Sequence, residues 1–140
     1  MLEWCSPAPG EFDRSTAYLF FLKMYRAGVP LMTGTDLSIP YTFAGFSLHD
    51  ELGLFVQAGL TPMEALPPAT RNPAVFLGEL SSQGTIERGK IANFVLLDAN
   101  PLENILNTQH IRAVVLNGKY LSKEALQKML ADVEAAVKRE

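Results

Sequence analysis

The sequence contains few of the residues from which disulfide frameworks and zinc sites are built. Its 140 residues include one cysteine, two histidines and one tryptophan. The single cysteine, Cys5, excludes an internal disulfide framework and is typical of a reducing compartment. The one cysteine and the two histidines also cannot form a structural zinc site alone, because such a site needs a full tetrahedral set of nitrogen or sulfur ligands.

Clusters of basic residues and long apolar runs are absent as well. Twelve Lys and Arg residues against fifteen Asp and Glu residues give a net charge of −3, so neither nucleic acid nor a membrane surface is expected as a partner. The most apolar stretch, residues 18–22, is far shorter than the ~20 residues that span a bilayer. No signal-peptide pattern is visible, and we therefore expect a cytoplasmic protein.

What is present is an ordinary globular composition, with 48% hydrophobic and 19% charged residues. Apolar residues at helical spacing predict a helix over residues 13–27. A short apolar run, residues 29–33, follows and predicts a buried strand. A helix leading into a buried strand is typical of α/β architecture.

The middle of the chain predicts short helices. Ser47 is expected to cap a helix over residues 48–58, and Thr61 and Glu64 form a capping-box pattern with a proline between them. Two prolines at positions 67 and 68 should keep that helix short. Asn72 is expected to cap another short helix that ends at Gly78.

After residue 78 the pattern predicts strands. These are residues 91–98 and 111–116, a turn at Asn117-Gly118, and a return strand over 119–121. Ser122 should then cap a final helix with one apolar face. One strand between helices cannot make a sheet, and two or three strands are marginal alone. The sequence therefore predicts a piece of a larger fold.

Asp36 is the strongest candidate for a chemical role. It follows the predicted strand at its carboxyl end, where the strands of an α/β barrel place catalytic groups. A carboxylate there could bind a metal and take a proton from water. The alternative is a turn aspartate that bonds its own backbone.

The remaining candidates are weaker. His49 could be a metal ligand or contact a substrate, but no other residue has ligand spacing to it, which favours a hydrogen-bonded or solvated histidine at a helix start. His110 is expected at the surface. Cys5 has no predicted helix start or base nearby, so a catalytic thiolate is not expected.

Several segments together resemble one family, in the order and spacing that this family shows. They extend from about residue 28 to residue 118. They are residues 28–36, 49–52, 57–66, 69–74, 84–92 and 95–102. These segments resemble the C-terminal part of the metal-dependent amidohydrolase superfamily, in the branch of imidazolonepropionase-like and Xaa-Pro dipeptidase-like enzymes.

The resemblance implies a fold in which the chain supplies only one part. Residues 1–78 would be the end of a (β/α)8 barrel, with its last strand at about 29–34. Residues 79–121 would form part of a small β-sandwich domain, and residues 122–140 a C-terminal helix. The barrel strands that carry the family's other metal ligands would precede this segment.

The resemblance also implies a chemistry. Asp36 would be both a metal ligand and the catalytic base in hydrolysis of a C–N bond in an amide, cyclic amide or dipeptide-like substrate. The divalent metal, zinc by this resemblance, would be held in the full-length protein and not by this chain alone. The residues with a candidate role in the substrate loop are Thr35, Tyr41, Phe43, Phe46 and His49. Plain loop packing is the alternative for the aromatic residues.

A second hypothesis belongs to a different functional class. The chain could be a non-catalytic interaction module that kept the amidohydrolase tail and lost the chemistry. In both cases the exposed barrel and sheet edges could pair with a second copy and give a homo-oligomer.

Overall fold

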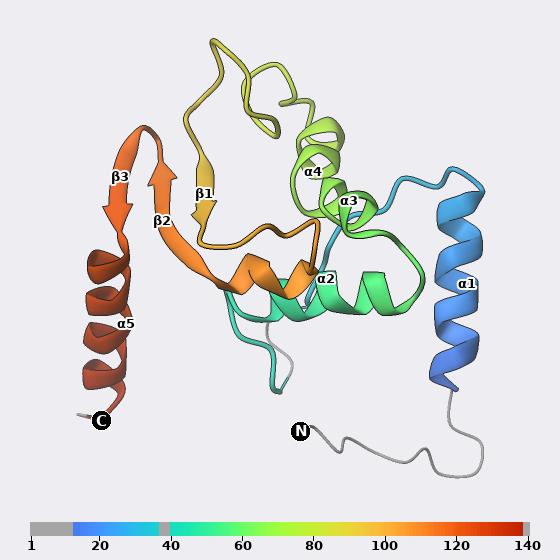
Figure 1. Cartoon of the computed structure of the whole chain (residues 1–140), viewed down its shortest axis with the longest axis horizontal. Helices are drawn as coiled ribbons and strands as arrows, with labels where there is room; N and C mark the ends of the chain where they lie inside the picture. Colours follow the sequence, from blue (N-terminus) through green and yellow to red (C-terminus); the bar gives the residue numbers. More distant parts are fainter. Residues whose placement is uncertain (1–12, 37–39, 139–140) are drawn as a thin grey trace.

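The computed structural model describes residues 13–36 and 40–138, which form a mixed α/β structure. Five α-helices, two 3-10 helices and three strands occur in this part of the chain. In order they are α1 (Arg14–Arg26), α2 (Ser47–Gln57), α3 (Pro62–Ala65), η1 (Pro67–Ala69), α4 (Arg71–Phe76), β1 (Phe94–Leu97), η2 (Ile105–Gln109), β2 (Ile111–Leu116), β3 (Lys119–Ser122) and α5 (Lys123–Val137). Figure 1 shows α2, α3 and α4 between α1 on one side and the sheet with α5 on the other.

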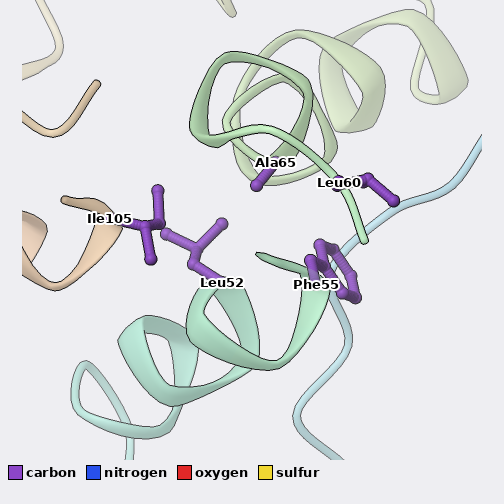
Figure 2. Packing of buried hydrophobic residues seen from close by; sticks show 5 residues of the cluster. All are labelled: Leu52, Phe55, Leu60, Ala65 and Ile105. Atoms are coloured by element: carbon purple, nitrogen blue, oxygen red, sulfur yellow. The ribbon is translucent and has the colours of Figure 1, made fainter. Parts of the chain in front are cut away.

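The core is small and is built mainly around α2. Its buried side chains come from α2, α3, η2 and the turn before α3, and they face one another in Figure 2. These residues are Leu52, Phe55, Leu60, Ala65 and Ile105. Helix α1 joins this core through Phe21, whose ring stacks on Phe55 with 4.8 Å between the centroids. The region after residue 78 is thus tied to the helical region through Ile105.

Local chemistry explains where several helices begin. The Asp13 carboxylate accepts a hydrogen bond from the Ser15 amide at the start of α1. Thr61 and Glu64 form the predicted capping box at α3, each accepting a hydrogen bond from the backbone amide of the other. The two prolines convert the following turn to η1, because they remove amide donors. Ser122 caps α5, accepting from the Ala125 amide as expected.

The three strands form one antiparallel sheet in the order β1-β2-β3. Phe94 pairs with Val115, and the register shifts between Leu96 and Leu97. Strands β2 and β3 are joined at Asn117 and Gly118, whose φ angles are +50° and +77°. Positive φ at both central residues is the backbone of the tight hairpin turn that the Asn-Gly pair favours, so this prediction is confirmed.

The structure differs from the sequence-based expectation at residues 29–34. These residues form neither helix nor strand. A strand requires a neighbouring strand to share its backbone hydrogen bonds, and the sheet in the described part of the chain contains only β1, β2 and β3. The expected strand over residues 91–98 is also shorter, since β1 covers only Phe94–Leu97.

Two expected helix caps are wrong. Helix α2 begins at Ser47 itself and has no side-chain cap, because the Ser47 hydroxyl accepts a hydrogen bond from the Phe43 amide. Helix α4 also has no side-chain cap. The Asn72 side chain instead donates to the Leu31 carbonyl at 2.7 Å. The Ser47 hydroxyl thus holds the loop before α2, whereas the Asn72 side chain holds the distant segment after α1.

The predicted apolar face of α5 is not covered in this structure. None of the helix residues is buried, and Val133 and Val137 are 63% and 68% exposed. None of the helices within residues 13–36 and 40–138 has the length and apolar character needed to cross a bilayer.

Candidate functional site

The segment that carries Asp36 runs from the end of α1 to residue 36 and is held without a strand ladder. Two of its residues form hydrogen bonds to η1 and α4. The Thr33 amide donates to the Pro68 carbonyl at 3.0 Å, and the Leu31 carbonyl accepts from the Asn72 side chain. Pro68 is fully buried, so this contact anchors the segment against the interior.

A third bond ties the segment to α2. Both carboxylate oxygens of Glu51 accept from the Gly34 amide, at 2.9 and 3.1 Å. Glu51 therefore holds the backbone two residues before Asp36. Three separate elements, α2, η1 and α4, thus set the path of the chain into the candidate site.

Asp36 itself adopts a left-handed backbone conformation, with φ of +50°. Aspartate tolerates this region better than most residues, but it is uncommon outside glycine and often marks a turn or a functional position. The Asp36 carbonyl accepts a hydrogen bond from the Thr42 hydroxyl at 3.4 Å, and the residue is exposed. Asp36 therefore lies at the surface of the described part of the chain.

The candidate substrate-loop residues are only partly described, since residues 37–39 lie outside the described part of the chain. Thr35 is half-buried. The aromatic residues Tyr41, Phe43 and Phe46 are 74%, 64% and 58% exposed, respectively. Their predicted position over a substrate stays a prediction. Cys5 also lies outside the described residues.

His49 is half-buried and bonds to a residue far along the chain. Its Nδ1 lies 3.0 Å from the Thr108 Oγ1, and the Thr108 hydroxyl already donates to the Ile105 carbonyl at 2.8 Å. The Thr108 oxygen is therefore the acceptor, which assigns the proton to Nδ1 and leaves Nε2 unprotonated. Burial lowers the pKa of His49, partly opposed by the charge of Asp50.

Sequence reasoning missed the two partners that define this region, Glu51 and Thr108. Glu51 could have been noted because it lies one turn into the predicted helix, beside His49 and Asp50. Thr108 offered no signal, because it is 59 residues from His49 and neighbouring polar residues in its segment look equivalent.

The described residues do not fit a divalent metal ion by themselves. Among residues 13–36 and 40–138, no three His, Cys, Asp or Glu side chains come together in a way that could hold one. A single carboxylate such as Asp36 leaves most of the coordination shell of a catalytic metal unfilled.

Comparisons with known proteins place these segments in a family. The model of the Amidohydrolase family matches residues 17–121. An imidazolonepropionase from Pyrobaculum arsenaticum is 41% identical over 76 residues, which cover 54% of this chain and 19% of the relative. An imidazolonepropionase from Pseudomonas savastanoi pv. phaseolicola is 42% identical over 93 residues, covering 66% and 23%.

A solved structure supports the same assignment. The crystal structure of a Xaa-Pro dipeptidase with methionine bound in its active site matches with a TM-score of 0.67 and 28% identity, covering 77% of this chain and 25% of that chain. The matches thus span between 19% and 25% of the length of these relatives. The resemblance found in the sequence is confirmed, and the chain belongs to the amidohydrolase family.

Proposed function

We propose that this chain is the C-terminal portion of a metal-dependent amidohydrolase that hydrolyses a C–N bond in a small amide, cyclic amide or dipeptide-like substrate. The family match over residues 17–121 supports hydrolysis of C–N bonds in general. The names of the similar proteins, imidazolonepropionase and Xaa-Pro dipeptidase, suggest the substrate classes.

The observation that supports a catalytic role for one residue is the placement of Asp36. Asp36 ends a segment that three elements hold in place, and its backbone lies in the left-handed region. In our proposal, residues 29–34 become the last strand of a (β/α)8 barrel when a neighbouring strand is present. Asp36 would then lie at the carboxyl end of that strand, where barrel enzymes place catalytic groups.

The chemistry that we assign to Asp36 is proton transfer. Its carboxylate would accept a proton from the attacking water and deliver it to the leaving nitrogen, since one carboxylate can serve first as base and then as acid. Members of the family generally depend on a metal, and we propose zinc. Because the described residues do not provide a ligand set, most ligands would come from elsewhere, with Asp36 as one of them.

The rest of the proposal follows from the family. Residues 79–121 would complete part of a small β-sandwich domain and residues 122–140 a C-terminal helix. The partner would be a small molecule in the cytoplasm. The isolated chain would be inactive. The alternative of a non-catalytic interaction module is not favoured, since the similar proteins reported above carry the names of enzymes.

A chimera tests the proposal. Residues 17–121, which the family model matches, would replace the corresponding segment of the Pseudomonas savastanoi imidazolonepropionase, and hydrolysis of its imidazolone substrate would be measured. We expect a folded, active chimera in which Asp36→Asn lowers kcat by about 10²–10⁴-fold, the usual contribution of general acid–base catalysis.

The matched control is Asp50→Asn, which removes an exposed carboxylate from the same segment and should leave kcat unchanged. Folding of each variant would be checked by circular dichroism. Full activity of the Asp36→Asn chimera would overturn the assignment. In parallel, the purified full chain should contain no stoichiometric zinc and show no turnover with imidazolone or dipeptide substrates. Stoichiometric zinc together with activity would contradict the proposal that the isolated chain is inactive.

A further inference from the structure

The turn between α4 and β1 forms a surface hollow that none of the candidate site residues lines. The hollow is shallow and open to solvent, and its volume is about 600 Å³. Its charged and hydroxyl-bearing residues are Arg71, Ser81, Thr85, Glu87, Arg88 and Lys90. Three cations against one carboxylate give this hollow a net positive charge, although the whole chain is negative.

The hollow is held in shape by a close approach between the turn and α4, which Figure 1 shows as neighbouring segments. Gly84 lies against the start of α4. A Cβ atom at this position would be 2.5 Å from the Ala74 Cβ and 3.5 Å from the Arg71 Cα. The Ile91 amide also donates to the Ser82 carbonyl at 2.9 Å and closes the base of the turn. Arg71 on α4 and Arg88 on the turn both line this hollow.

The single carboxylate of the hollow, Glu87, already has bonding partners within the turn. The Thr85 hydroxyl donates to Glu87 at 2.6 Å, and the Lys90 ammonium lies 3.4 Å from the same oxygen. Hydrogen bonds from Thr85 and Lys90 lower the pKa of Glu87, so it is ionised at neutral pH. The Lys90 side chain is only 10% exposed, which makes it a support of the turn and not a free cation.

The two arginines have no such partner. None of the ion pairs within the described part of the chain includes Arg71 or Arg88, and both residues are exposed. Two uncompensated guanidinium groups on one hollow attract a dianion. Planar guanidinium forks match phosphate oxygens especially well, because one phosphate can accept bidentate bonds from more than one arginine.

We propose that the hollow between α4 and the turn at residues 81–90 binds a phosphate group, with Arg71 and Arg88 as its principal ligands and the Ser81 hydroxyl as a further donor. This site is independent of the hydrolytic site proposed around Asp36.

The test is a titration of the purified full chain with inorganic phosphate, followed by the backbone amide resonances of residues 81–90 at constant ionic strength. We expect saturable shifts confined to this turn and the start of α4. Arg71→Gln and Arg88→Gln should each weaken binding at least about tenfold, the effect of losing a charged hydrogen bond.

The matched control is Lys119→Gln, which removes an exposed cation from β3 and should leave phosphate binding unchanged. A parallel titration with succinate separates a phosphate site from a carboxylate site. The proposal is overturned by the absence of saturable shifts, by equal weakening in Lys119→Gln, or by binding of succinate without phosphate. Each variant alters an exposed side chain, so folding should be retained.

Discussion

Individual polar side chains in this protein form bonds to partners that are distant along the chain. His49 bonds to Thr108 across 59 residues, and Gly34 bonds to Glu51 across 17. The first bond joins α2 to η2, and the second joins the segment after α1 to α2, so neither lies within one element. The consequence is that the environment of a titratable group such as His49 depends on the folded state.

The pH dependence of stability should therefore report on His49. Burial lowers its pKa below the ordinary value of 6.5, so the unfolded chain binds a proton that the folded chain does not. The stability linked to neutral His49 is present above pH 6.5 and is lost as the pH falls through the folded pKa. Urea unfolding between about pH 7.5 and 5.5 should show this loss.

The substitution His49→Gln should flatten this dependence, because it removes the titrating group while keeping a side chain that can donate to Thr108. The control is His110→Gln at an exposed position, which should keep the slope of the parent chain. An unchanged slope in His49→Gln, or a flattened one in His110→Gln, would assign the effect to other groups.

At the scale of elements, the junction of α2 with η2 connects the two halves of the chain. Ile105 is 5% exposed and belongs to the core cluster, whereas its neighbour Leu106 is 49% exposed. The two side chains are of equal size and adjacent in the sequence, so a comparison of their substitutions isolates the effect of burial.

We predict that Ile105→Ala destabilises the protein by about 2–5 kcal/mol, the cost of removing a buried aliphatic side chain and leaving a cavity. Leu106→Ala should cost less than about 1 kcal/mol, since its side chain is half exposed. Urea unfolding monitored by circular dichroism measures both. Equal costs for the two variants would mean that η2 is not packed on α2 in solution.

Elements also differ in how far local chemistry predicted them. The capping box at Thr61, the cap at Ser122 and the turn at Asn117 are confirmed, because each depends on a few neighbouring residues. The expected caps at Ser47 and Asn72 are wrong, because distant or preceding backbone groups take their side chains. Local patterns cannot show such competition.

The whole molecule exposes more apolar surface than one small core can cover. Large apolar side chains are exposed along α5, on β1 and in the segments around α4. Strand β1 lies at an edge of the sheet in the described part of the chain, and its Val95 and Leu96 are 49% and 41% exposed. An apolar edge strand is a template for pairing with another strand.

We therefore predict that the purified chain self-associates through β1. Sedimentation velocity should give a weight-average mass that rises with concentration above that of the 15.4 kDa monomer. Leu96→Lys should weaken association by roughly tenfold, or about 1.4 kcal/mol. The control Leu102→Lys changes an equally exposed leucine in the turn after β1 and should leave association unchanged. A strictly monomeric chain, or equal effects of both variants, would contradict pairing at this edge.

The amino-acid sequence was sufficient for the family, for the helical and strand segments with local signals, and for singling out Asp36. These depend on motif order, periodicity and capping, which are properties of short stretches of chain. The role of Asp36 stays a prediction.

The folded arrangement was needed for everything that joins distant residues. It showed that residues 29–34 form no ladder, that Glu51 holds the backbone before Asp36, that Thr108 bonds to His49, and that Gly84 lies against α4. The physical reason is that hydrogen-bond partners and close approaches are set by packing, and a strand exists only beside another strand.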